Sequence, residues 1–188
     1  MSDGNHSGKS GEDLYRCFLE GDETAFEEMV GLYRKSLTRY IYTFVNDTRE
    51  AEELMIDAFA ALSVDTRYSG KSSLKTYLFA IGRNTTLHHI RKYKRVDNIS
   101  IESIVEDTYD MENLPELDFI KKEERSRLRA AMDRLKIEYR EVLHLIYFEN
   151  MNYADAGASM NKSVKQVEYL MRAAKASLKN ILESEGMG

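Results

Sequence analysis

Apolar residues recur every three or four positions through most of the chain, and no stretch alternates apolar and polar residues as a β-strand does. The first long run predicts a helix over residues 23–44, with Asp22 as its N-terminal cap. Asn46 interrupts this run. Asp47 followed by Glu50 resembles a capping box and predicts a second helix, whose apolar face is formed by Ala51, Leu54, Ala58, Phe59 and Leu62.

The pattern changes again after the second helix. Residues 68–73 are polar and predict a loop, after which a third helix begins at Leu74 and runs into a basic segment that ends at Arg95. Residues 96–118 have no sustained helical period, are strongly acidic and contain Pro115, the only proline. Three or four further helices follow, the clearest of which carries Tyr139, Val142, Leu143, Ile146 and Tyr147 on one stripe.

These elements predict an all-α fold of two small helical domains joined by an acidic linker. Residues 1–11 are polar and rich in Gly and Ser, which predicts a disordered tail. The first domain is predicted over residues 12–96, the linker over 97–118 and the second domain over 119–186.

The last two predicted helices indicate a helix-turn-helix. Residues 152–160 form the first helix, 161–163 the turn and 164–178 the second helix; Asn161 tolerates positive φ and Ser163 can cap the second helix. Gly157 in the first helix leaves room for the second to cross close to it. The candidate base readers are Lys165, Gln166 and Tyr169, with Arg172 and Lys175 on the phosphate backbone; Ser163, at the start of the helix, is counted with them as a DNA-contacting residue. An αα-hairpin without a DNA role is the alternative.

The charged residues add a further indication of function, because they are distributed unevenly along the 188 residues, whose formal net charge is −5. Residues 67–95 contain eight basic residues and no acidic one, whereas the preceding and following segments are acidic. Basic, hydroxyl and aromatic side chains in one segment suit single-stranded or locally opened nucleic acid, with Tyr68, Tyr77 and Asn84 able to contact an unstacked base. Tyr77 shares the stripe of Leu74, so we expect it in the core rather than as a stacking platform.

The second predicted helix has an acidic face as well as an apolar one. Such a face is usually only solvated; the functional alternative is a docking surface for a basic protein. Met55 and Ile56, which lie off the apolar stripe, favour the docking surface.

Other classes of function find little support. The single cysteine, Cys17, cannot form an internal disulfide, and the sequence has neither an apolar leader nor a membrane-spanning segment, so we expect a cytoplasmic protein. His6, His88, His89 and His144 are scattered, and no catalytic or metal-binding motif is present. We expect neither an enzyme nor a metal or cofactor.

With these residues in view, the chain resembles a bacterial RNA polymerase sigma factor of the sigma-70 family, of the small extracytoplasmic-function (ECF) type. Residues 50–59 resemble region 2.2, 72–84 resemble regions 2.3 and 2.4, and 135–178 resemble region 4. The resemblance implies that Glu50, Glu52, Glu53, Leu54, Ile56 and Asp57 bind core polymerase. It implies that the −10 DNA is bound by Ser69, Lys71, Ser72, Lys75, Arg83, Asn84, His88, Arg91 and Lys92, and that the helix-turn-helix residues above bind the −35 element.

The resemblance also implies partners. Core RNA polymerase would be contacted through the coiled coil of its largest subunit and the flap of its second-largest subunit. Promoter DNA would be bound in both double- and single-stranded form. An anti-sigma factor would act as regulator. The free protein is expected to be a monomer. The rival hypothesis is a stand-alone helix-turn-helix regulator with an N-terminal dimerisation or effector domain, which leaves the acid-free segment unexplained.

Overall fold

The computed structural model describes residues 6, 8–65, 67–93 and 122–185. Within them it is all-helical, which confirms the predicted fold class. The elements are α1 (Gly11–Leu19), α2 (Glu23–Val45), α3 (Thr48–Ser63), α4 (Leu74–Tyr93), α5 (Lys122–Asp133), α6 (Ile137–Leu143), the π-helical turn η2 (His144–Phe148), α7 (Tyr153–Met160) and α8 (Val164–Glu185). They form two compact units, the first built from α1 to α4 and the second from α5, α6, η2, α8 and most of α7.

The starts and stops of α2 and α3 agree with the sequence pattern. Asp22 caps α2 by accepting hydrogen bonds from the backbone N–H groups of Thr24 and Ala25. Asn46 ends that helix in the left-handed conformation, with φ of 56°. Asp47 then caps α3 by accepting the N–H of Glu50 at 2.7 Å. These short-range contacts fix the helix ends without help from the rest of the fold.

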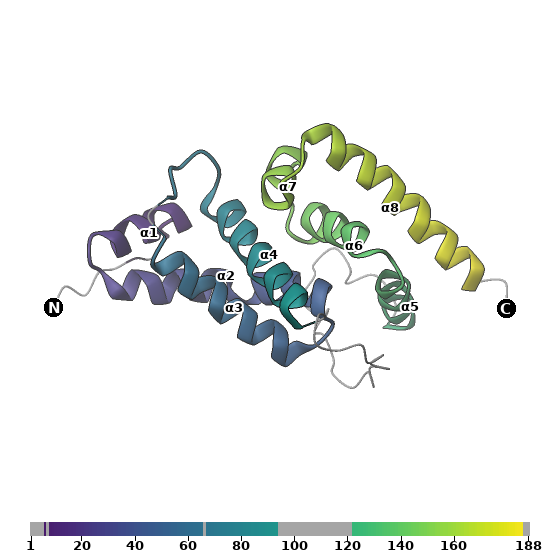
Figure 1. Ribbon diagram of the computed structural model, residues 1–188, viewed down its shortest axis with the longest axis horizontal. Helices are drawn as coiled ribbons and strands as arrows, with labels where there is room; N and C mark the ends of the chain where they lie inside the picture. Colours follow the sequence, from purple (N-terminus) through teal and green to yellow (C-terminus); the bar gives the residue numbers. More distant parts are fainter. Residues whose placement is uncertain (1–5, 7, 66, 94–121, 186–188) are drawn as a thin grey trace. The chain divides into compact units, whose positions relative to one another are not determined.

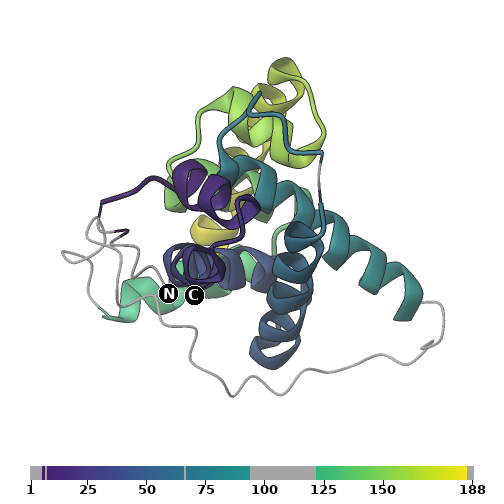
Figure 2. The same ribbon diagram turned by 90° about the vertical axis from the view of Figure 1, so that its left-hand side faces the viewer.

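The core of the first unit lies among α2, α3 and α4, and Figures 1 and 2 both show α4 (teal) lying against α3 (blue). Gly82 of α4 meets α2 closely, since a Cβ there would lie 2.9 Å from Leu37 Cδ1. The small residue therefore lets these two helices approach. The largest fully buried side chains of the unit are Met29, Leu37, Tyr40, Ile41, Leu62, Leu74, Leu78 and Phe79.

Helix α1 is an element that the periodicity did not predict. It begins at Gly11, which the sequence placed at the end of a disordered tail, and Ser10 caps it by accepting the N–H of Asp13. Leu14 and Tyr15 are buried against the unit. Nine residues are too few for a clear helical period, and docking on the other helices supplies the stability that an isolated helix of this length lacks. Residues 1–5 and 7 of the predicted tail, and the whole predicted linker, lie outside the described residues.

The stripe predicted over residues 139–147 is only partly correct. Val142 and Leu143 are buried, but Tyr147 is 47% exposed, and Leu145 is buried in its place. The reason is the π-helical turn, in which the N–H of Glu149 donates to the carbonyl of His144 five residues earlier. The extra residue per turn rotates the following side chains away from the α-helical phase.

Helices α7 and α8 form the predicted helix-turn-helix. Asn161 has φ of 53°, and the N–H of Lys162 donates to the carbonyl of Gly157 at 2.8 Å. Ser163 and Gln166 cap α8 reciprocally: the Ser163 hydroxyl accepts the N–H of Gln166, and the Gln166 side-chain carbonyl accepts the N–H of Ser163. The short loop between the helices is thus held at both ends.

Candidate nucleic-acid and partner interfaces

The outer face of α3 presents acidic side chains around one apolar residue. Glu52, Glu53 and Asp57 are exposed, and Ile56 among them is 61% exposed. Four of the six residues predicted to bind core polymerase therefore share one surface, which we call the α3 acidic face. A large apolar side chain ringed by carboxylates suits a basic partner that also has an apolar contact.

Two of the sequence expectations for α3 are wrong, namely that Leu54 binds core polymerase and that Met55 lies off the apolar face. Leu54 is only 2% exposed and Met55 8%, so both side chains belong to the core and neither can contact a partner directly. The apolar face of α3 is wider than one stripe because α2 and α4 both pack on this helix. Glu50 is half-buried, and its carboxylate pairs with His89 Nε2 of α4 at 2.6 Å, which ties the start of α3 to the end of α4.

The loop between α3 and α4 and helix α1 line an open cavity of about 550 Å³. Ser72 is the only predicted −10 residue in its lining; Ser69 and Lys71 are exposed on the same loop. The other wall comes from α1, which the sequence analysis did not consider, because no local pattern links residues 12–19 to residues 68–73. The lining residues are Glu12, Tyr15, Arg16, Leu19, Tyr68, Gly70, Ser72 and Ser73.

Asp65, a residue that the sequence analysis did not single out, anchors this loop. Its buried carboxylate accepts hydrogen bonds from the backbone N–H, Nε and Nη2 of Arg67, each at 2.9 Å, and from the Tyr77 hydroxyl at 2.7 Å. Its backbone carbonyl accepts the Tyr15 hydroxyl of α1 at 2.7 Å. The hydrogen bonds from the Arg67 side chain, above all, hold the pKa of Asp65 well below its usual value.

Glu12 connects α1 to the start of α4. Its Oε1 atom accepts the N–H of Leu74, the first residue of α4, at 2.8 Å. Burial raises the pKa of Tyr33 to about 12 and also raises that of Tyr68; in both cases the charge of Glu12 adds to the effect. The Glu12 carboxylate is thus close enough to both rings to act on them electrostatically.

The two tyrosines of the acid-free segment have different surroundings. The Tyr77 hydroxyl donates to Asp65, and its half-buried ring packs on Tyr68 with centroids 5.1 Å apart, in accord with a structural role. Tyr68 lines the cavity, where its hydroxyl donates to the carbonyl of Ser72 and its ring meets Tyr15 edge to face. Tyr68 is therefore the aromatic ring offered to a ligand in this cavity.

Along α4 the predicted −10 residues separate into two groups. Asn84, His88 and Arg91, spaced by four and three residues, are exposed along one side of the helix, and Lys92 follows them. Lys75 and Arg83 are half-buried and lie off this stripe; the Lys75 ammonium stands over the Phe79 ring at 5.6 Å. The exposed group is placed to follow a phosphate backbone.

On α8 the predicted −35 residues also separate. Lys165, Tyr169 and Arg172, spaced by four and three, are exposed on one face, with Tyr169 66% exposed. Ser163 and Gln166 are engaged in the cap described above. Lys175 turns elsewhere: its ammonium lies over the Tyr147 ring at 5.5 Å, and a hydrogen bond with Tyr147 raises its pKa.

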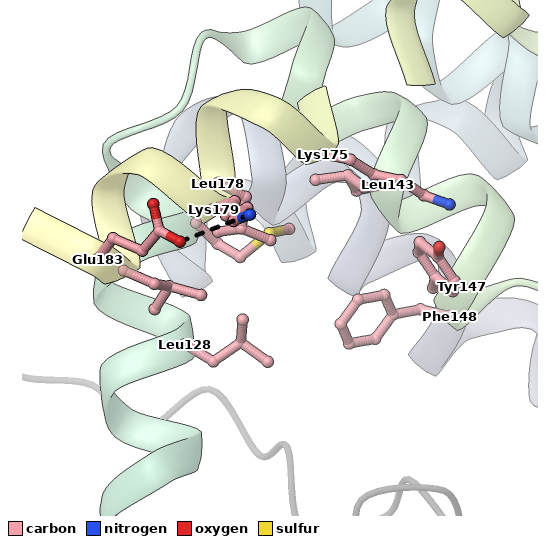
Figure 3. A pocket seen from close by; sticks show the side chains of 10 residues that line it. Leu128, Leu143, Tyr147, Phe148, Lys175, Leu178, Lys179 and Glu183 are labelled. Atoms are coloured by element: carbon pink, nitrogen blue, oxygen red, sulfur yellow. Dashed lines mark ion pairs between the residues drawn. The ribbon is translucent and has the colours of Figure 1, made fainter. Parts of the chain in front are cut away.

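Lys175 borders an apolar groove of about 710 Å³ in the second unit, shown in Figure 3. The groove runs between α5, the α6–η2 segment and α8, with an ion pair between Lys179 and Glu183 at its edge. Its apolar lining comes from Leu128, Met132, Leu143, Phe148, Leu178 and Leu182. Such a groove has the shape and chemistry to receive an apolar segment of a partner.

Across the described parts of the chain, no helix is long and apolar enough to cross a membrane.

Comparison with known families shows to which family the chain belongs. Residues 29–96 match the family model for sigma-70 region 2, and residues 125–178 match that for sigma-70 region 4. The chain belongs to the sigma-70 family. Matches in both units, in this order, favour a sigma factor over a stand-alone helix-turn-helix regulator.

Relatives identify the type of sigma factor. The chain is 26% identical to the ECF RNA polymerase sigma factor SigM of Bacillus subtilis over 153 residues, which cover 81% of this chain and 92% of SigM. It is 27% identical to the RNA polymerase sigma-H factor of Pseudomonas aeruginosa over 182 residues, covering 92% and 93%. The chain is therefore a sigma factor of the ECF type.

Two solved structures share the fold. CnrH in complex with the cytosolic domain of CnrY matches with a TM-score of 0.67 at 20% identity, over 93% of this chain and 97% of that one. The sigma factor RpoE of Bartonella quintana in complex with the anti-sigma factor NepR matches with a TM-score of 0.68 at 23% identity, over 84% and 96%.

Proposed function

We propose that this sigma factor directs transcription initiation through separate surfaces for core polymerase and for the two promoter elements. The α3 acidic face binds core RNA polymerase, the cavity beside residues 67–73 together with the exposed stripe of α4 holds the melted −10 strand, and the outer face of α8 holds the −35 duplex. The observation that carries the proposal is the cavity of about 550 Å³, which offers the Tyr68 ring next to a helix with exposed basic residues.

Opening the −10 duplex requires no chemistry from this chain. A base that leaves the stack and enters the cavity gains a contact with Tyr68, while Arg91 and Lys92 neutralise backbone phosphates. Because the contact with Tyr68 forms only with an unstacked base, binding shifts the population toward the open state. The free energy of opening thus comes from capture of the strand.

The α8 face suits duplex DNA. The N-terminal part of the second helix of a helix-turn-helix enters the major groove, where Lys165 and Tyr169 reach base edges and Arg172 reaches a phosphate. Ser163 and Gln166 act first as the cap that sets the direction of this helix. We therefore assign them a positioning role ahead of base contact.

The apolar groove of the second unit is the proposed contact for the flap of the second-largest polymerase subunit. A partner helix with apolar residues on one side would cover Leu128, Phe148 and Leu178. The solved relatives named above are bound to CnrY and to the anti-sigma factor NepR, which supports an anti-sigma protein as a partner of this chain too.

The charge distribution favours action only in the assembled polymerase. With a formal net charge of −5, the free chain has little general attraction for DNA. Docking on polymerase adds a second surface and makes DNA binding effectively intramolecular. We expect the free chain to bind promoter duplex far more weakly than the holoenzyme does.

The test is run-off transcription with bacterial core polymerase, with and without this chain, on a library of genomic fragments from the host. The expected result is a discrete set of new transcripts that share two upstream elements. A folded chain that neither stimulates transcription nor co-elutes with core polymerase would contradict the proposal.

Replacing Ile56 by Asp is expected to weaken binding to core polymerase about tenfold, which corresponds to about 1.4 kcal/mol. The change removes the apolar centre of the α3 acidic face and puts a charged group where the partner's apolar contact would lie, whereas stability is little affected because the side chain is exposed. Affinity is measured by titrating labelled chain with core. Leu32→Asp on α2, which also replaces an exposed apolar residue, is the matched control; equal losses from both changes would argue against the α3 surface.

A further inference from the structure

The α1 wall of the cavity is the part of the proposed −10 site that the family match does not cover. The region 2 match begins at residue 29, and α1 ends at Leu19. Glu12 is the only carboxylate in the cavity lining, which otherwise holds hydroxyl, aromatic and apolar side chains and Arg16. A carboxylate repels phosphate, so backbone binding gives no reason for its presence where a DNA strand is captured.

Glu12 is held with one oxygen engaged and the other available. The N–H of Leu74 donates to Oε1 at 2.8 Å, which fixes the carboxylate at the start of α4. Among the described residues, Oε2 has no hydrogen-bond partner. Tyr68 lines the same cavity from the opposite element, the loop before α4. A base stacked on Tyr68 therefore presents its edge to a group that accepts hydrogen bonds and cannot donate them.

We propose that Glu12 is a specificity-determining residue, which selects an amino base, cytosine or adenine, over a keto base at one position of the melted −10 strand. This inference rests on the proposed function of the cavity. Cytosine N4 and adenine N6 donate to a carboxylate oxygen, whereas the carbonyls at the same place in thymine and guanine repel it.

The hydrogen bond at Glu12 Oε1 also disfavours guanine, the keto base that carboxylates otherwise bind well. Guanine offers two parallel donors, N1–H and N2–H, and satisfying both requires both oxygens of the carboxylate. Since Oε1 already accepts the Leu74 N–H, guanine would have to share this oxygen with the backbone donor, whereas a single amino donor uses Oε2 alone. Thymine has one donor, N3–H, but its two flanking carbonyls face the same carboxylate and repel it.

The experiment uses holoenzyme reconstituted from the full chain and bacterial core polymerase, on a promoter whose −10 element is randomised. Transcripts are sequenced to give the preference at each position. For the unaltered chain we expect one position at which cytosine or adenine is favoured over thymine and guanine about tenfold. Glu12→Gln keeps an oxygen for the Leu74 N–H and replaces the second acceptor by a donor. It should move the preference at that position to thymine or guanine and leave the other positions unchanged.

Asp13→Asn is the matched control, because it removes the same charge one residue away on α1, from a side chain that does not line the cavity. An amino-base preference that Glu12→Gln reverses and Asp13→Asn retains supports the inference. A preference that persists in Glu12→Gln overturns it while leaving the proposed function intact. If the unaltered chain gives no core-dependent transcripts at all, the proposed function fails and the inference fails with it.

Discussion

A Gly157→Ala variant is expected to lose −35 recognition because the helix-turn-helix cannot close. A Cβ at this position would lie 2.6 Å from the carbonyl oxygen of Lys162 and 3.5 Å from Val167 Cγ2. The near atom belongs to the backbone, and the turn that carries it is fixed by the hydrogen bond from the Lys162 N–H to the Gly157 carbonyl. The clash can be relieved only by opening the turn, at a cost of about 1–3 kcal/mol to the second unit.

The measurement is hydrogen exchange of the backbone amides of α7 and α8, together with transcription from a promoter that depends on its −35 element. Protection in α8 should fall, and transcription should fall with it, while protection in α2 to α4 is retained. Gly31→Ala is the matched control: it makes the same substitution in a helix where nothing lies within 4 Å of the added Cβ. That variant should gain about 0.5–1 kcal/mol, because alanine favours helix over glycine. Unchanged exchange in Gly157→Ala would refute the close-approach explanation.

An Asp65→Asn variant is expected to lose promoter opening while core binding persists. The substitution replaces an ionised acceptor of four hydrogen bonds by a neutral amide, whose NH2 group cannot accept the hydrogen bonds that Arg67 and Tyr77 donate. Hydrogen bonds to a charged group stabilise by about 1.5–3 kcal/mol, so we expect a loss of about 2 kcal/mol in the first unit. Residues 67–73 would then no longer hold the cavity in shape.

Opening is measured by permanganate reactivity of thymines in the −10 region, and core binding by titration. Tyr77→Phe, which removes one of the four hydrogen bonds, should have a smaller effect of about 1.5 kcal/mol. Normal permanganate reactivity in Asp65→Asn would show that the anchor does not shape the site.

The lowered pKa of Asp65 predicts that the free energy of unfolding depends on pH in the acid range. The pKa of Asp65 is lowered in the folded state, so the stabilisation is complete above the unfolded pKa of about 3.9 and is lost as the pH falls below it. Between about pH 4 and pH 2, the unaltered chain should therefore lose more stability than Asp65→Asn, as urea unfolding followed by circular dichroism would report. Equal pH dependence in the two proteins would contradict this assignment.

Part of the candidate site could be predicted because its residues are neighbours in sequence. The acidic residues on α3, the exposed stripe of α4 and the trio Lys165, Tyr169 and Arg172 each repeat at three or four residues on one helix. A helix converts such a spacing into a common face wherever the helix sits. The width of the apolar face of α3 was misjudged at Met55, because packing by neighbouring helices sets how wide a buried face becomes.

The remainder of the site joins residues far apart in the chain. Glu12 meets Leu74 across 62 residues, and Tyr15 meets the Asp65 carbonyl across 50. Neither contact leaves a local pattern, and α1 itself is too short to show a helical period. The π-helical turn at His144–Phe148 was missed for a related reason, since the sequence pattern assumes one constant rotation per residue.

The amino-acid sequence by itself determined the long helices α2, α3, α4 and α8, the caps at Asp22, Asp47 and Ser163, the helix-turn-helix and the separation of acidic from basic segments, because each depends on interactions within a few residues. The tertiary structure alone decided that α1 forms one wall of the cavity beside Tyr68 and that Asp65 anchors the loop opposite. Those contacts form only when α1 docks on helices distant in sequence and buries Leu14 and Tyr15, which no local spacing encodes.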